Sequence, residues 1–220
     1  MFRAVLLSLV SFVAFAGTAN ALEFRADFRQ STFQVTAGDT FSDLLAQHEG
    51  ETLIQSNVID SLQNVSTAVH GGGVNSNYSI LMTTDVTIGI EGQYTFQVGT
   101  DWGRGGAAAL IDNTTGSVVY ERVITDDVWW GYNWNNPDVF ETTFDFAAGD
   151  SYTLAWVGFE GCCGGSTTLR FSVDGSGFAD LTSANFDPYM LTPEPSSGVL
   201  VALGLAGLAT TRRRAERHSA

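Results

Sequence analysis

The chain has no lysine: all ten of its basic residues are arginines, whereas 24 residues are acidic. The imbalance is greater between Leu22 and Thr192, where five arginines and 22 acidic residues give a formal charge of −17. A surface with this charge repels the phosphates of nucleic acids and of anionic lipids. We therefore predict that nucleic acid is not a partner, and that the charge mainly keeps the protein soluble.

Histidines and known catalytic motifs are also scarce. Only His48 and His70 lie outside the C-terminal tail, and the chain lacks a Gly-x-Ser-x-Gly elbow, a His-Glu-x-x-His helix and a phosphate-binding loop. The sequence does not exclude a pair of carboxylates that hydrolyses glycosides, because it does not show which acidic residues lie close together in space. We therefore expect a protein that is not an enzyme, with polysaccharide hydrolysis as a distant alternative.

Cysteine is rare as well, since Cys162 and Cys163 are the only two and are adjacent. One such pair does not make a disulfide-rich scaffold, so a hydrophobic core must hold the fold together. The 171 residues from Leu22 to Thr192 are long enough to form such a core in a single domain.

The N-terminal residues 1–21 have the order of parts that is typical of a signal peptide. Arg3 supplies a positive start, residues 4–17 are almost entirely apolar, and Ala19-Asn20-Ala21 has the small-x-small pattern read by signal peptidase. A buried N-terminal helix is the alternative. We predict that signal peptidase cleaves here and that the mature chain starts at Leu22, outside the cytoplasm.

The C-terminal residues 193–220 combine Pro193-Glu194-Pro195, an uncharged run over residues 196–211 and the arginines Arg212, Arg213 and Arg214. As a helix the run would be roughly 24 Å long, against about 30 Å for a hydrocarbon core. The arginines favour a cytoplasmic C-terminus. We therefore expect a short transmembrane helix that anchors the chain temporarily.

This C-terminal order of motif, apolar helix and arginines resembles the PEP-CTERM sorting signal of Gram-negative bacteria. The resemblance implies export across the inner membrane and processing of the tail by exosortase. It also implies a place at the cell surface or outside the cell, in association with exopolysaccharide and biofilm. An ordinary C-terminal membrane anchor is the alternative.

The segment between the two signals is predicted to be mainly β. Apolar and polar residues alternate in several short runs, and one run is continuously apolar, as in a strand that is buried on both sides. Turn residues separate the runs, which favours an antiparallel β-sandwich. The predicted strands are residues 53–59, 78–90, 94–98, 107–111, 140–146, 152–159 and 169–173, of which 107–111 is the continuous apolar run.

One short helix is expected near the start of the domain, with Asp39 as N-cap, Phe41 and Leu44 on its apolar side and Gly50 at its end. We accordingly divide the exported part into N-terminal strands and a helix over residues 22–77, and a sandwich over residues 78–192.

The run "GQYTFQVGTDWGRGGAAALID" and the later "FDFAAGDSYTLAWVGFE" resemble, in this order, the protective-antigen type of β-sandwich. The "CCGG" that follows resembles the PEP-CTERM group with a Cys-Cys-x-Gly motif. In lectins of the protective-antigen type, two consecutive aspartates and an asparagine hold a Ca²⁺ ion that binds sugar hydroxyls. Asp126 and Asp127 match the consecutive pair, while the asparagine has no clear counterpart.

The loop "TDDVWWGYNWNNPD" is the main candidate for ligand binding, because indole rings stack on sugars and carboxylates or amides bind sugar hydroxyls. The alternative is that its aromatic residues close the end of the sandwich and its Asp and Asn residues make turns. The candidate residues for carbohydrate or calcium are Asp126, Asp127, Trp129, Trp130, Trp134 and Asn135.

For Cys162 and Cys163 the options are two thiols, an intermolecular bridge or a bond between neighbours. Export disfavours free thiols. A bond between neighbours is strained, because adjacent Cα atoms are about 3.8 Å apart and disulfides usually need roughly 4.4–6.8 Å. Flanking glycines give the chain freedom to bend. We predict an intramolecular vicinal disulfide that fixes its loop.

Together these features predict an exported, non-catalytic protein of the cell surface or matrix, with signal peptidase, exosortase, the membrane and exopolysaccharide as partners. A Ca²⁺-dependent carbohydrate-binding module is the alternative.

Overall fold

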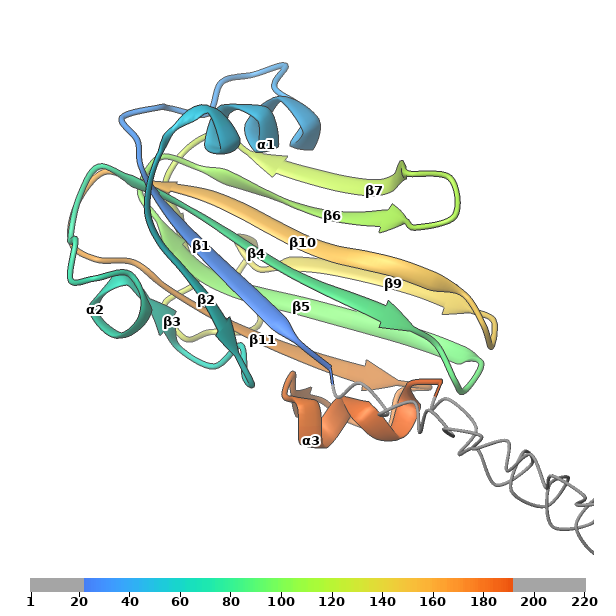
Figure 1. The fold of residues 1–220 in the computed structure, drawn as a ribbon. Helices are drawn as coiled ribbons and strands as arrows, with labels where there is room; N and C mark the ends of the chain where they lie inside the picture. The colour runs from blue at the N-terminus through green and yellow to red at the C-terminus, as the bar shows by residue number, and fades with distance from the viewer. Residues whose placement is uncertain (1–21, 192–220) are drawn as a thin grey trace, which may run out of the picture. The chain divides into compact units, whose positions relative to one another are not determined.

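The computed structural model describes residues 22–191, which form two antiparallel β-sheets packed face to face (Figure 1). The first sheet has the strand order β2-β1-β4-β10-β6-β7. Its strands are β1 (Phe24–Gln30), β2 (Thr52–Ile59), β4 (Tyr78–Thr87), β6 (Gly106–Asp112), β7 (Ser117–Ile124) and β10 (Ser151–Glu160).

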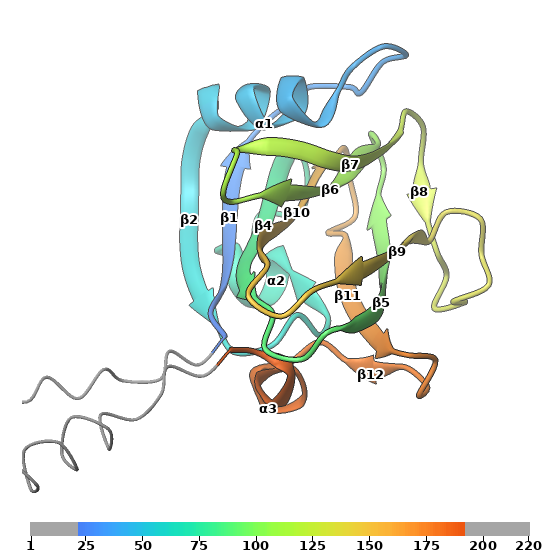
Figure 2. The ribbon, with the colours of Figure 1, turned by 90° about the vertical axis from the view of Figure 1, so that its right-hand side faces the viewer.

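The second sheet is centred on β5, which pairs with three other strands, and Figure 2 shows it beside the first sheet. Its strands are β3 (Val65–Ser66), β5 (Gly92–Trp102), β8 (Val128–Trp129), β9 (Phe140–Phe146), β11 (Ser166–Val173) and β12 (Ala179–Asp180). The predicted antiparallel β-sandwich is confirmed by this arrangement.

The main core lies between the two sheets and follows from the alternation in the sequence. In β9, Phe140 and Phe146 are buried at the two ends, while Glu141 and Asp145 point to the other face and are exposed. β5 likewise buries Tyr94, which packs against Phe146 with ring centroids 5.4 Å apart. Because side chains alternate across a strand, one face of each strand supplies this core.

The first sheet is also covered on its other face, by α1 (Phe41–Gly50). Phe41 and Leu44 of the helix pack against alanines of β6, whose central residues are therefore buried on both faces. The prediction that the continuous apolar run over residues 107–111 is a strand buried on both sides is therefore confirmed.

The start of α1 differs by one residue from the prediction. Thr40, not Asp39, is the N-cap: its hydroxyl accepts a hydrogen bond from the backbone N–H of Asp43, and the Asp43 carboxylate accepts one from the N–H of Thr40. This reciprocal pair is a capping box. Asp39 instead accepts hydrogen bonds from the backbone and hydroxyl of Thr36, so it stabilises the preceding turn.

Strands β1 and β2 belong to the first sheet, whereas β3 belongs to the second. β1 pairs with β2 on one side and with β4 on the other. Two short helices, α2 (Thr67–His70) and α3 (Ser183–Phe186), and a 3₁₀ turn, η1 (Asp187–Tyr189), complete the described chain.

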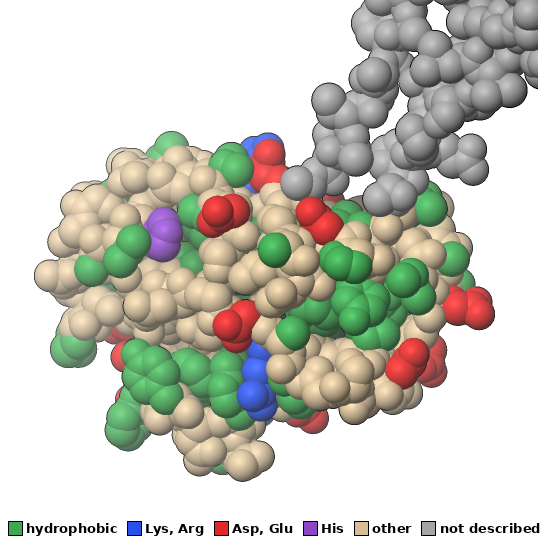
Figure 3. Space-filling view, turned by 90° about the horizontal axis from the view of Figure 1, so that it is seen from below, with side chains coloured by type: hydrophobic (Ala, Val, Ile, Leu, Met, Phe, Trp, Pro, Cys, Tyr) green, Lys and Arg blue, Asp and Glu red, His purple; other side chains and the backbone are tan. Residues whose placement is uncertain are grey.

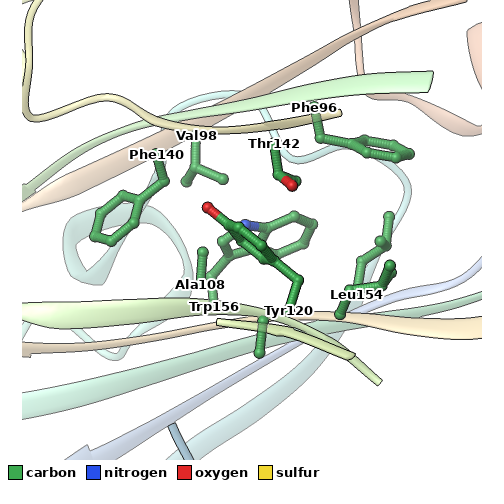
Figure 4. Close-up of a pocket in the computed structure, with 10 residues that line it drawn as sticks. Phe96, Val98, Ala108, Tyr120, Phe140, Thr142, Leu154 and Trp156 are labelled. Carbon is green, nitrogen blue, oxygen red and sulfur yellow. The ribbon is translucent and has the colours of Figure 1, made fainter. Parts of the chain in front are cut away.

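A small cavity of about 20 Å³ lies between the sheets (Figure 4). Tyr120 and Trp156 point into it from the first sheet, and Phe140 and Thr142 line it from the second. The Tyr120 hydroxyl donates a hydrogen bond to the Glu141 carbonyl, 3.1 Å away, and thereby links the two sheets. The cavity is only large enough for about one water molecule, so it is a packing defect and not a ligand site.

Among residues 22–191, no helix has the length and apolar character needed to cross a membrane. The predicted signal peptide over residues 1–21 and the predicted helix and arginines of residues 193–220 lie outside the described residues.

Candidate functional site

The tryptophan-rich loop lies beside the end of β5, because the short strand β8 pairs with it. Asp101 is opposite Trp129 and Trp102 is opposite Val128 in this pairing. The side chains of a strand alternate, so consecutive residues of β8 and its continuation face different surroundings. Trp129 is 62% exposed, whereas Trp130 is only 4% exposed.

Trp130 and Trp134 have structural contacts. Trp130 lies directly on Gly99 of β5, where a Cβ atom would come within 2.3 Å of the indole ring. Trp134 packs edge-on against Trp130 with ring centroids 4.4 Å apart, and the guanidinium of Arg170 stacks on Trp134 at 4.0 Å. These two tryptophans therefore hold the loop on the outer face of the second sheet, on the side of Gln97 and Gly99, and do not belong to the core between the sheets.

The polar residues of the loop fix its backbone. The Asn136 side-chain amide donates hydrogen bonds to the carbonyls of Trp129 and Trp130, at 3.0 and 3.3 Å. Arg122 of β7 donates to the carbonyls of Pro137 and Val139, at 2.7 and 2.6 Å. These hydrogen bonds fix the backbone of the loop to which the exposed Trp129 belongs.

The cysteine loop follows β10 and reaches the same region. Cys162 and Cys163 form a disulfide with each other, and their Cα atoms are 3.8 Å apart. Cys163 and Gly164 both have positive φ angles, +73° and +71°, so the chain turns sharply just after the disulfide. This left-handed conformation is uncommon for a residue other than glycine.

The buried carboxylate of Glu160 holds the base of the cysteine loop. It is 2% exposed and accepts hydrogen bonds from the backbone N–H groups of Cys162, at 2.8 Å, and of Gly103, at 3.0 Å. Burial raises the pKa of Glu160, the backbone hydrogen bonds oppose that rise, and the nearby Asp101 adds to it. Glu160 therefore joins the end of β10 to the turn between β5 and β6.

The exposed tryptophan and the cysteine loop lie on the walls of one open cleft of about 590 Å³. Four segments that are distant in the sequence contribute to it: the chain between β1 and α1, the end of β5 with the turn after it, the start of the tryptophan-rich loop, and the end of β10 with the chain after it. The cleft is lined by Gln34, Asp101, Gly103, Arg104, Asp127, Trp129, Glu160, Gly161, Cys162 and Cys163.

The charge of the cleft is mainly negative. Burial raises the pKa of Asp101, and the negative charge of Asp127 raises it further. Within residues 22–191 the one ion pair joins Arg25 and Glu23, so neither aspartate of the cleft has a cationic partner there. The Arg104 guanidinium is occupied elsewhere, since it donates to the Asn77 side chain at 2.7 Å.

The predicted binding residues are therefore only partly brought together. Asp127 and Trp129 line the cleft, while Asp126, Trp130, Trp134 and Asn135 are not among its lining residues. The Asn135 backbone N–H instead donates to the Asn133 side chain at 3.1 Å. In the part of the chain that the structure describes, no three His, Cys, Asp or Glu side chains are grouped to hold a metal ion.

Sequence reasoning missed Glu160 and Gln34 as parts of the site. Gln34 donates hydrogen bonds to the carbonyls of Arg104 and Thr125, at 3.1 and 3.0 Å, and so ties two walls of the cleft together. Nothing in the local pattern around Gln34 indicates this role. Glu160 could have been found, because a glutamate at the end of an apolar strand next to two cysteines and three glycines is an unusual combination.

Comparison with known proteins identifies the C-terminal motif. The model of the PEP-CTERM protein-sorting motif matches residues 191–214, so the sorting motif predicted from Pro193, Glu194, Pro195 and the following arginines is confirmed. No curated protein is significantly similar to the chain in sequence.

Solved structures of similar fold have low sequence identity. The PA14 sugar-binding domain from an RTX adhesin has a TM-score of 0.48 at 9% identity, covering 75% of this chain and 97% of its own. The epithelial adhesin 9 A domain from Candida glabrata, solved in complex with Galβ1-3GlcNAc, has a TM-score of 0.49 at 10% identity, with coverages of 80% and 92%. The PA14 domain of the MpAFP antifreeze protein has a TM-score of 0.44 at 13% identity, with coverages of 78% and 94%.

Proposed function

We propose that this chain is an exported, non-catalytic protein of the cell surface or extracellular matrix, and that its sandwich domain binds carbohydrate in the cleft beside Trp129. The sorting motif over residues 191–214 supports export and a surface or extracellular location. In this proposal exosortase processes the tail, and the released domain associates with exopolysaccharide in a biofilm.

The observation that carries the binding proposal is the exposed indole of Trp129 next to free carboxylate oxygens. The ring is 62% exposed although tryptophan is usually buried, and it lines a concave surface. The apolar face of a sugar ring can stack on an indole, while its hydroxyls donate hydrogen bonds to carboxylates. Asp101 and Asp127 supply such acceptors within the same cleft.

The walls of the cleft are held in place by covalent and hydrogen bonds, which favours binding because little conformational entropy is lost when the ligand binds. The vicinal disulfide restrains one wall, and the two backbone hydrogen bonds to Glu160 fix it to the turn after β5. Gln34 joins that turn to the start of the tryptophan-rich loop. The disulfide also presents an apolar edge to the ligand.

The charge of the cleft suggests which sugars it accepts. Two aspartates without a cationic partner repel uronates and sulfated sugars. The face of the molecule in Figure 3 has acidic side chains distributed over it and few basic ones, so long anionic polymers are repelled as well. We therefore expect neutral glycans or amino sugars to bind better than acidic ones.

A calcium-dependent mode of binding is the second candidate. It is favoured by the proximity of Asp101 and Asp127, since the charge of Asp127 raises the pKa of Asp101 and a cation would relieve this repulsion. Calcium requires six to eight oxygen ligands, so the ligand's hydroxyls and water would have to complete the site.

A glycan array that compares neutral, amino and acidic glycans, with and without a chelator, tests these proposals. Trp129→Ala should weaken binding about 5- to 30-fold, equivalent to ~1–2 kcal/mol, because the stacking surface is lost. Tyr132→Ala is the matched control, because Tyr132 is 72% exposed in the same loop but does not line the cleft.

Equal losses for Trp129→Ala and Tyr132→Ala, or no glycan binding by the wild-type protein, would contradict the cleft proposal. Loss of binding in the presence of chelator would favour the calcium mode. Release of reducing ends from a bound polysaccharide would contradict a non-catalytic role. A deletion strain that forms a normal matrix would count against the association with exopolysaccharide.

A further inference from the structure

Leu22, the first residue that the structure describes, is fixed in the fold by its side chain and its backbone. The side chain of Leu22 is 4% exposed and belongs to the main core. Its carbonyl accepts a hydrogen bond from the Ser183 hydroxyl at 2.7 Å, and the next carbonyl, of Glu23, accepts one from Thr84 at 2.9 Å. These contacts fix the position of the Leu22 backbone nitrogen.

That nitrogen lies against a carboxylate. The Leu22 N–H donates to Oδ1 of Asp187 at 3.0 Å, although the two residues are 165 positions apart. Glu23, the nearest acidic residue in the sequence, is already paired with Arg25 at 2.7 Å. Asp187 is therefore the carboxylate that faces the Leu22 nitrogen.

The same nitrogen is the atom that signal-peptide cleavage would release. The small-x-small pattern Ala19-Asn20-Ala21 places the predicted cut directly before Leu22. Cleavage there converts a neutral amide N–H into a positively charged α-ammonium group, and water supplies the atoms that complete the two new chain ends. A charged donor makes a stronger hydrogen bond to a carboxylate than a neutral amide does.

We propose that Asp187 is a built binding site for the mature N-terminus, and that removal of the signal peptide creates an ion pair between the Leu22 ammonium and the Asp187 carboxylate. The ion pair joins β1 to η1, which begins at Asp187. The sorting motif starts at residue 191, so the newly formed N-terminus stabilises the last turn of the domain before that motif. Removal of the signal peptide at the N-terminus thereby stabilises η1, the segment that precedes the C-terminal sorting motif.

The absence of lysine allows a selective test. After cleavage, the N-terminal amine is the one aliphatic amine of the mature chain, so an acetylating ester modifies only this group. The full chain is exported with its own signals, and intact mass identifies its first residue. We expect the mature chain to begin at Leu22, and its amine to acetylate about tenfold more slowly than in the Asp187→Asn variant, since an adjacent opposite charge favours the unreactive ammonium form.

The control is Asp180→Asn, which removes an exposed carboxylate on β12 and should leave the labelling rate unchanged. Acetylation should also lower the melting temperature of the wild-type protein but leave that of a folded Asp187→Asn variant unchanged. The wild-type comparison remains informative if that variant does not fold. A first residue other than Leu22, equal labelling rates, or an unchanged wild-type melting temperature would overturn the proposal.

Discussion

Lowering the pH from 7 to 5 should destabilise the domain through His48, a histidine of α1 that is completely buried. Its Nδ1 atom is 2.8 Å from the Ser79 hydroxyl on β4, and its Nε2 atom has no hydrogen-bond partner. Burial lowers the pKa of His48 from 6.5 to about 4; the positive charge of Arg29 contributes, and the negative charge of Asp27 opposes.

The sign and size of the effect follow from this shift. Between pH 6.5 and about 4 the unfolded chain binds a proton at His48 that the folded chain does not, so the free energy of unfolding decreases as the pH falls. At ~1.4 kcal/mol per pKa unit, the total loss is about 3 kcal/mol, of which roughly 2 kcal/mol falls between pH 7 and pH 5. The stability from this group is complete above pH 6.5 and lost by about pH 4.

Urea unfolding at several pH values measures this loss, and His48→Asn isolates it. Asp101 and Glu160 act in the opposite direction, because their raised pKa values make the folded chain bind protons more strongly than the unfolded chain does. The variant keeps both carboxylates, so subtracting its pH profile from that of the wild type removes their contribution. The variant should be less stable at pH 7 but less sensitive to acid. Parallel profiles for the two proteins would refute the reasoning.

Four further predictions concern other parts of the protein. Trp130→Ala should cost ~3–5 kcal/mol of stability by urea unfolding, because this buried ring fills the space above Gly99, whereas Trp129→Ala should cost much less. Glu160→Gln should cost about 1–3 kcal/mol and weaken glycan binding, since an amide can accept with only one of its two ends, so one of the two charge-assisted hydrogen bonds from the backbone is lost. Mass spectrometry of unreduced, alkylated protein should find Cys162 and Cys163 joined to each other; two alkylated cysteines, or a dimer that is lost on reduction, would reject the intramolecular bond. Intact mass of surface-released protein should show that the chain ends near Pro195, and retention of Arg212, Arg213 and Arg214 would contradict removal of the tail.

Much of the sandwich could be predicted from the sequence, because alternation is a local property of a strand. The predicted strand over residues 140–146 has the same bounds as β9, and the continuous apolar run lies within β6. β7 was missed because it is an edge strand with exposed apolar residues, among them Val119 at 48%, so its alternation is obscured. β1 was also missed, although Phe24, Ala26 and Phe28 do alternate with polar residues.

The sorting motif could also be found from the sequence alone, since Pro193-Glu194-Pro195, the apolar run and the arginines follow one another directly in the chain. The candidate site was not. Trp129 and Trp130 are neighbours of the same residue type, and they differ in exposure because Trp130 packs on Gly99 of β5 and against Trp134. Only the tertiary structure could distinguish them.

The cleft and the N-terminal contact depend entirely on tertiary structure. Trp129 lines the same cleft as Cys162 and Cys163 because β8 pairs with the end of β5, and the chain after β10 returns to the same place. Leu22 meets Asp187 because core packing brings the two ends of the domain together. A local pattern determines which way a side chain points along a strand, whereas contacts between distant segments depend on the pairing of strands and the packing of the whole core.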